Sequence, residues 1–469
     1  EIGDALNQLT REILRHLKLH KLTVIWLFDE STSMKDDQKV ILEKFDRVTT
    51  ELKLGVDQAA ANKKALPALS HVIVGFGEKI DPILTKPTPD VKLVSKAIQR
   101  LNIDVTGIEN TMQAIKFVVD QFSNLITKER KLLLVLVTDE SGDDGANIEE
   151  ARQALKSRHV PLYVVGRQSL FGFPFAHHRY VDQTTGDTYY PVIRRGPESA
   201  DIEMYQWDGL YDRWDEQPSG FAPFELARLT KESGGLYFLL PSEEFMRVRQ
   251  REQAYSIAQL KEYMPEYENR MAYVEHRNRS PLRRELYEIV SETRNFRYRR
   301  EFPIEPQPLV QAAAQEGEKA AERLQILFNI QARLEQLAKV GERETERRWR
   351  AHYQLMHAST VAFQVKAYEY QALMASVVNS PPSPAKPPAP GIDVFWVVDH
   401  SKTPLAPPNE TAKKYAEARR LLEKVIADHP KTPWADLAKD VLDRGLSVRF
   451  SEWHRSPKYT ERMQYVPKY

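Results

Sequence analysis

Leu22-Thr-Val-Ile-Trp-Leu-Phe28 is a continuous, largely apolar run, and Asp29-Glu-Ser-Thr-Ser33 follows it directly. An apolar run of this length is typical of a strand that is buried on both faces. The segment after it places one carboxylate and two hydroxyls at every second position, on Asp29, Ser31 and Ser33. A loop that leaves a parallel strand can aim these side chains at one point, where hard oxygen ligands suit a divalent cation such as Mg2+.

Strand and helix patterns alternate around this run. Further apolar strands are predicted at residues 131–137 and 161–165, a hairpin at 71–84, and a last strand at 235–240. Alternation of this kind over about 220 residues predicts an α/β fold, in which helices cover both faces of a doubly wound, mostly parallel sheet.

The composition excludes several classes of protein. The chain has 469 residues, with 67 Lys and Arg against 66 Asp and Glu, and no cysteine. The lack of Cys excludes disulfides, Cys-based zinc and iron–sulfur sites and thiol nucleophiles, and a net charge of +1 gives no reason to expect nucleic acid. No apolar run reaches the roughly 20 residues of a membrane span. Because the first residue is Glu1, we expect a trimmed product whose removed signal or anchor directed it to an extracytoplasmic location or the cell surface.

The connection over residues 167–222 is too long to be a simple loop between a strand and a helix, where about two to six residues usually suffice. This insert is rich in aromatic residues, and the sequence around Thr184-Thr-Gly186 predicts a hairpin within it. It can form a ligand cage, a protein-binding face, a self-packed subdomain or a set of buried anchors to the helical region. Trp and Tyr are enriched in binding hot spots, so the candidates for partner contact are Tyr205, Trp207, Tyr211 and Trp214.

The sequence divides into four parts. Residues 1–242 form the α/β domain with its insert, and residues 243–379 predict long helices that form a stalk or coiled coil. A stiff Pro-rich linker covers 380–391. Residues 392–469 predict a small helical segment with a single tetratricopeptide-like hairpin, which cannot bury its own face and must dock on something else.

Three further motifs follow the Asp29 loop along the chain. Val135-Leu-Val-Thr-Asp139 is a buried strand that ends in Thr-Asp, Gly107-Ile-Glu-Asn-Thr111-Met-Gln-Ala-Ile115 leads into a helix, and residues 224–238 supply a final helix and strand. With these motifs, residues 20–242 resemble the bacterial type of von Willebrand factor type A domain. The resemblance implies a six-stranded sheet in the order 3-2-1-4-5-6, with the second strand antiparallel. It also implies a metal-ion-dependent adhesion site formed by Asp29, Ser31, Ser33 and Asp139.

The sequence departs from the family pattern at Glu109, which stands where the family has a metal-binding threonine. Asp29, Asp139 and Glu109 together would place three carboxylates around one dication, so a partner's carboxylate would gain little there. Ca2+ or Mn2+ accommodates such crowding better than Mg2+, whose octahedral geometry is strict. Glu109 as a metal ligand and Glu109 as a solvent-facing loop acid both remain open. Two roles remain open for the acids at 140, 143 and 144. They can form a second shell around the cation, or they can be solvated side chains at a helix N-terminus.

The resulting hypothesis is a non-enzymatic protein-binding, adhesion or scaffold protein that is stabilised by a divalent cation and acts in a larger assembly. Its partners are proteins, self-assembly included. One alternative is a metal-dependent hydrolase or phosphatase that uses Asp29 as its nucleophile. Such a loop needs a second Asp where this chain has Ser31, and no phosphate-binding or nucleophile-elbow motif is present. A helper subunit of an ATPase complex is the other alternative.

Overall fold

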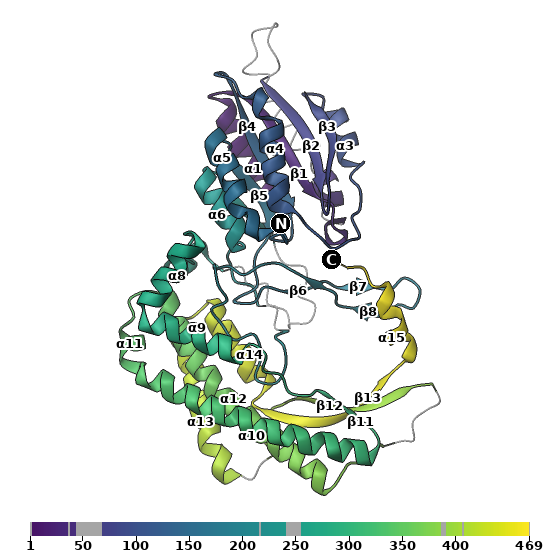
Figure 1. Ribbon diagram of the computed structural model, residues 1–469, viewed down its shortest axis with the longest axis vertical. Coiled ribbons are helices and arrows are strands. Elements are labelled where there is room, and N and C mark those ends of the chain that lie inside the picture. The colour runs from purple at the N-terminus through teal and green to yellow at the C-terminus, as the bar shows by residue number, and fades with distance from the viewer. Residues whose placement is uncertain are drawn as a thin grey trace.

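Figure 1 shows two bodies in the computed structural model, an α/β domain and a mostly helical body. The structure describes residues 2–35, 38–43, 68–214, 217–240, 255–385, 391–405 and 408–468. The predicted boundary at 242/243 and residues 386–390 of the predicted linker lie outside the described residues. Among the described helices, none combines the length and the apolar character that crossing a bilayer requires.

A six-stranded sheet forms the centre of the α/β domain, in the order β10-β5-β4-β1-β2-β3. Its strands are β1 (Lys21–Asp29), β2 (Leu69–Phe76), β3 (Ile80–Thr88), β4 (Arg130–Thr138), β5 (Leu162–Arg167) and β10 (Tyr237–Leu240). The predicted fold class and strand order are confirmed. The prediction of an antiparallel second strand is wrong, because β2 is parallel to β1 and only β3 runs antiparallel. A tight turn at Gly77 joins β2 to β3, and a connection that short can link only antiparallel strands.

Helices cover both faces of this sheet. One face packs against α1 (Ile2–Leu17) and α3 (Val91–Ile98), and the other against α4 (Thr111–Gln121), α5 (Ile148–Arg158) and α6 (Phe224–Ser233). Successive residues of a strand point to opposite faces, so Trp26 lies in the first core and Ile25 in the second. Both side chains are fully buried, and each such burial contributes about 1.5–3 kcal/mol to folding.

The insert contains two small antiparallel strand pairs, one nested inside the other. The outer pair is β6 (Ala176–His177) with β9 (Val192–Ile193), and the inner pair is β7 (Tyr180–Val181) with β8 (Thr188–Tyr189). Asp182 Oδ1 accepts a hydrogen bond from the backbone N–H of Thr184 at 2.7 Å and thereby stabilises the turn of the inner pair. The predicted hairpin is confirmed.

The helical body is built around the 33-residue helix α12 (Arg347–Asn379), along which α10 (Pro306–Gln336) and α13 (Pro408–Asp428) pack. A three-stranded sheet, β11 (Glu301–Pro303), β12 (Asp393–Ser401) and β13 (Ser447–Arg455), lies against it. Among the described residues after 254, the other α-helices are α7 (Ile257–Leu260), α8 (Arg270–Arg279), α9 (Pro281–Thr293), α11 (Ala338–Arg343), α14 (Pro433–Arg444) and α15 (Pro457–Arg462).

The helical body differs from the predicted stalk and separate C-terminal segment. In α12 even the polar Thr360, Gln364 and Lys366 are buried, which a free-standing stalk would not allow. The helix pair α13–α14 is present and docks on α12, but the segment after residue 392 also contributes strands β12 and β13. Because β12 pairs with β11, the predicted second and fourth parts share one sheet.

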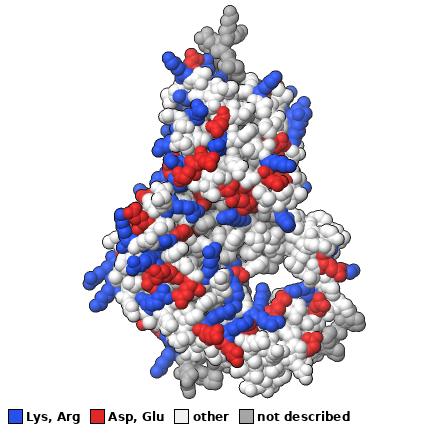
Figure 2. All heavy atoms as spheres, viewed as in Figure 1, with Lys and Arg blue, Asp and Glu red and all other residues white. Residues whose placement is uncertain are grey.

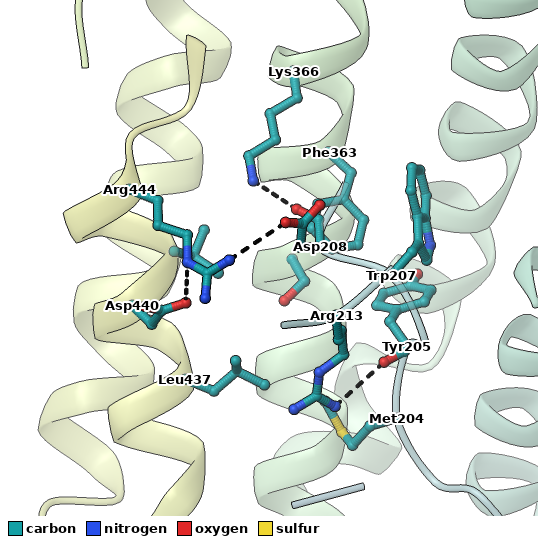
Figure 3. Close-up of a pocket in the computed structure, with 12 residues that line it drawn as sticks. Met204, Tyr205, Trp207, Asp208, Arg213, Phe363, Lys366, Leu437, Asp440 and Arg444 are labelled. Atoms are coloured by element: carbon teal, nitrogen blue, oxygen red, sulfur yellow. Dashed lines mark hydrogen bonds and ion pairs between the residues drawn. The ribbon is translucent and has the colours of Figure 1, made fainter. Parts of the chain in front are cut away.

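Part of the insert belongs to the core of this helical body, whereas another part forms a small apolar cluster of its own, with Leu170, Phe173, Ala176 and Ile193. One apolar cluster runs from Phe171 in the insert to Val448 in β13. Polar contacts of Asp208 also join the insert to the helical body (Figure 3). The backbone oxygen of Asp208 accepts a hydrogen bond from Lys366 Nζ of α12 at 2.6 Å. The carboxylate of Asp208 lies 3.5 Å from Arg444 Nη1 of α14. These residues line a cavity of about 20 Å3, the size of a single water molecule.

Candidate metal centre

The four oxygen-bearing residues predicted as metal ligands lie together at the carboxyl edge of the sheet. Strands β1 and β4 are parallel neighbours, so the loops that follow them start side by side. Ser33 Oγ donates to Asp139 Oδ1 at 3.0 Å, and the hydroxyls of Ser31 and Ser33 are 3.0 Å apart. The structure thus brings together the two loops that the sequence predicted to form one site.

Asp29 is held rigidly at the centre of this group. Its Oδ1 accepts from the backbone N–H of Ser31 at 2.8 Å, and its Oδ2 accepts from the hydroxyl of Thr138 at 2.6 Å. The side chain is completely buried. Burial first, and the carboxylate of Asp139 second, raise the pKa of Asp29 to about 7.

Glu109 lies close to the site, in a buried position. Its side chain is buried, so the open alternative of a solvent-facing acid is wrong. Burial, followed by the carboxylates of Asp29, Asp143 and Asp139, raises the pKa of Glu109 to about 9. Among the described residues, no group of three or more His, Cys, Asp and Glu side chains is arranged to hold a metal ion. A site with three carboxylates around the ion therefore stays a prediction.

The three acids after β4 have different environments. Asp144 caps helix α4, because its carboxylate accepts from the backbone N–H groups of Met112 and Gln113 at 2.9 and 2.8 Å. Asp143 is partly exposed, whereas Glu140 is buried, so a solvated helix N-terminus is the wrong description of Glu140. Burial and the nearby Glu109 raise the pKa of Glu140 well above its usual value.

The donor set fits a hard divalent cation. Two carboxylates and two hydroxyls converge from two loops, and oxygen ligands of this kind are those that Mg2+, Mn2+ and Ca2+ prefer. Two buried oxygens beside them, Glu140 Oε1 and Thr111 Oγ1, have no hydrogen-bond partner within the part of the chain that the structure describes. Buried oxygens normally have partners, and a cation with its water ligands would supply them.

The insert reaches the same edge of the sheet. Arg195 Nη2 lies 3.9 Å from Asp139 Oδ2, and both side chains are buried. Arg194 Nη1 lies 3.6 Å from Asp143 Oδ1. The insert therefore forms one wall of the candidate centre, as the parallel direction of β5 predicted.

Three of the four aromatic residues predicted to contact a partner, Tyr205, Trp207 and Tyr211, instead hold the insert to the helical body. Tyr205 and Trp207 are buried against α12, where the Tyr205 hydroxyl bonds Thr360 Oγ1 at 2.7 Å. Tyr211 donates to the carbonyl of Val398 at 2.7 Å, and Trp214 is half-buried and stacks on His177 with ring centroids 3.7 Å apart. The alternative of buried anchors is correct for Tyr205, Trp207 and Tyr211, because the helical body offers the insert an apolar surface that sequence patterns do not reveal. Partner contact by Trp214 stays a prediction.

Sequence reasoning missed the loop between α3 and α4, which adjoins the centre. Asp104 is partly exposed and accepts from the backbone N–H of Glu78 at 2.7 Å, and Glu109 is buried, whereas Ile103, Val105 and Ile108 are exposed. Exposed apolar side chains beside a buried acid reverse the usual arrangement of a surface loop. The signal was present in the sequence as Ile-x-Val-x-x-Ile between Asn102 and Glu109.

Comparisons with known proteins agree with this fold. Residues 24–171 match the von Willebrand factor type A domain. The match covers less than half of the 469-residue chain and ends inside the insert. Domains of this family typically mediate protein interactions in assemblies, and we refer to the α/β domain below as the type A domain. No curated protein matches the chain.

Solved structures resemble the chain only distantly. The conserved hypothetical protein BatB from Bacteroides thetaiotaomicron is 14% identical, with a TM-score of 0.29, over 47% of this chain and 91% of that one. An aerotolerance-related membrane protein from Bacteroides fragilis is 13% identical, with a TM-score of 0.28 and the same coverage. A mutant of the PilB minor pilin from Streptococcus sanguinis is 12% identical, with a TM-score of 0.25, over 31% of this chain and 50% of that one. No role follows from likenesses at these scores.

Proposed function

We propose that this protein is a non-enzymatic, metal-dependent protein-binding subunit of a larger assembly, and that it binds its partner at the carboxyl edge of the type A domain. The observation that carries the proposal is the convergence of Asp29, Ser33 and Asp139 from two parallel strands. When bound, a divalent cation would supply a positive charge that can coordinate an oxygen ligand. The residues of the chain hold the ligand oxygens in place: Thr138 and the backbone of Ser31 fix the Asp29 carboxylate.

The surroundings of the centre favour a protein partner. Three exposed apolar side chains, Ile103, Val105 and Ile108, adjoin it, and clustered exposed apolar side chains mark interaction sites. On the face shown in Figure 2, acidic and basic side chains are interspersed over both bodies. A surface with mixed signs suits a protein partner better than a polyanion, which needs a continuous basic surface.

The first test is binding of the ion itself. Titration of Mn2+, Mg2+ or Ca2+ into the full chain, followed by calorimetry, should show one site per chain, and Asp29→Asn should abolish it. Asp120→Asn is the matched control, since Asp120 is an exposed residue of α4 about 15 Å along that helix from the centre. Failure of every ion to bind the wild-type chain would refute the metal-dependent part of the proposal.

The second test concerns the partner. The full chain is used as bait in extracts of its native cell, in Mn2+ and in EDTA, with Asp29→Asn as a parallel bait. A protein that is recovered by the wild type in Mn2+, and lost in EDTA and with Asp29→Asn, supports metal-dependent binding. Recovery of the same proteins under all three conditions would contradict it.

A further inference from the structure

The insert contacts the loop after β4 at three successive residues. Arg194 and Arg195 face Asp143 and Asp139, at 3.6 and 3.9 Å. Gly196 lies against Ser141 so closely that a Cβ on it would be 2.6 Å from the serine Oγ. Gly196 also has φ +82, a conformation that favours glycine. Both the close approach and the backbone conformation therefore require glycine at this position.

Arg195 is held in place much more firmly than Arg194. Its side chain has no exposed surface, whereas that of Arg194 is 55% exposed. Its Nη1 donates to the carbonyl of Gln168 at 3.4 Å, and the backbone N–H of the next residue donates to Pro174 at 3.0 Å. Burying a guanidinium is costly unless negative charge compensates it, and the carboxylates of the centre supply that charge.

The two oxygens of Asp139 have different neighbours. Oδ1 accepts the hydroxyl of Ser33, which belongs to the predicted ligand set, and Oδ2 faces the guanidinium of Arg195. An ion bound by Asp29, Ser33 and Asp139 would therefore share one carboxylate with a fixed positive charge. Two cations at one carboxylate repel each other, and a buried environment strengthens that repulsion.

We propose that Arg195 is a tethered counter-cation of the metal centre, which competes with the divalent ion for Asp139 and keeps the affinity for that ion low. This inference rests on the proposed metal-dependent function and adds a regulator to it, the insert. Coupling between two bound groups is reciprocal. Arg195 weakens ion binding, and the ion must weaken the contact between the insert and the loop at 139–143 by the same factor.

The experiment measures Mn2+ affinity by calorimetry for the full-length wild type and three variants. Arg195→Gln removes the charge and nearly keeps the length, and Arg195→Lys keeps the charge. Arg228→Gln is the matched control, because Arg228 is also a buried, ion-paired arginine of the type A domain, with Glu149 and Glu232 as partners. We expect Arg195→Gln to bind Mn2+ about tenfold more tightly, within the usual range of coupling between sites. Arg195→Lys and Arg228→Gln should stay within about twofold of the wild type, a change well below that coupling.

A second readout does not depend on whether Arg195→Gln folds. Hydrogen exchange in the wild-type chain, measured at residues 192–197 with and without Mn2+, should become about tenfold faster in Mn2+ as the ion loosens the contact. Two results would overturn the role of Arg195. One is hydrogen exchange at residues 192–197 that is unchanged or slower in Mn2+, and the other is an Arg195→Gln chain that binds Mn2+ no more tightly than the wild type. If the wild type and Arg195→Gln both fail to bind the ion, the metal-dependent function falls as well. If the wild type binds Mn2+ and Arg195→Gln binds it no more tightly, the metal-dependent function stands and only the role of Arg195 is refuted.

Discussion

Glu203→Gln tests whether the insert is locked to the helical body by charge. Glu203 is buried, and its Oε2 accepts from Arg348 Nη2 at 2.5 Å and from Arg348 Nε at 2.8 Å. His352 Nε2 lies 2.9 Å from the same oxygen, and the hydroxyl of Tyr273 donates to Oε1 at 2.6 Å. Arg348 also pairs with Glu198 at 3.1 Å. The substitution nearly keeps the shape of the side chain, removes its charge and replaces one of its two acceptor oxygens by an amide donor.

Two independent routes give a similar magnitude. Burial alone would raise the pKa of Glu203, but the charge of Arg348 and the hydrogen bond from His352 outweigh it and lower the pKa from 4.5 to about 2. At about 1.4 kcal/mol per pH unit, this difference corresponds to about 3 kcal/mol of stability at neutral pH. Breaking a buried ion pair by removing one partner costs about 3–5 kcal/mol. We therefore expect Glu203→Gln to lower the free energy of unfolding of the helical body by about 3 kcal/mol.

Urea unfolding at pH 7, followed by tryptophan fluorescence and circular dichroism, measures this loss. Glu275→Gln is the matched control, since Glu275 forms an exposed ion pair with Arg279 on α8, and such pairs contribute at most about 1 kcal/mol. A loss for Glu203→Gln no larger than that of the control would refute the reasoning.

The pH dependence gives a second check on the same variant. The folded pKa of Glu203 lies below its unfolded value, so its contribution is complete above about pH 4.5 and is lost as the pH falls towards 2. The stability difference between the wild type and Glu203→Gln should narrow over that window. In the wild type, burial lowers the pKa of His352 to about 4, which destabilises the protein in acid, and burial raises the pKa of Glu198, which acts in the opposite direction.

Three further outcomes follow from the site and the insert. EDTA should lower the melting temperature of the type A domain, because an ion at 100 times its Kd adds about 2.7 kcal/mol to stability, and an unchanged value would contradict a bound ion. Glu109→Thr should raise the melting temperature measured in EDTA, because it removes a carboxyl whose burial beside other carboxylates is unfavourable; a fall would show that Glu109 is needed for packing. Val105→Glu should reduce partner capture without changing the melting temperature, since Val105 is 67% exposed, and equal capture would place the partner elsewhere.

The sequence was a good guide to the type A domain because its strands are buried on both faces. Continuous apolar runs such as 22–28 and 131–137 identify such strands directly, and parallel strands necessarily end at one edge, where Asp29 and Asp139 meet. The positions of these two loops could therefore be predicted without any knowledge of the side-chain contacts.

The insert and the helical body were predicted less well because their structure depends on contacts between distant residues. Trp207 contacts Phe363, and Tyr211 bonds Val398, 187 positions later in the chain. Composition shows that such a segment is aromatic but not whether a surface exists to bury it. Arg195 was missed for the same reason, since only the folded insert brings it to Asp139.

Helix α15 binds the inner strand pair of the insert, and this contact has a consequence for biosynthesis. Tyr459 stacks on Tyr189, whose hydroxyl donates to the backbone oxygen of Tyr459, 270 positions later, and Arg462 pairs with Asp182 at 2.7 Å. At about 5–20 residues per second, a ribosome makes these two halves of the contact roughly 15–50 s apart. During that interval the β7–β8 hairpin is already synthesised but lacks the residues that hold it. A nascent chain therefore carries this hairpin without that support until its last residues are made, and a message truncated before Tyr459 would yield a protein whose insert never acquires the support.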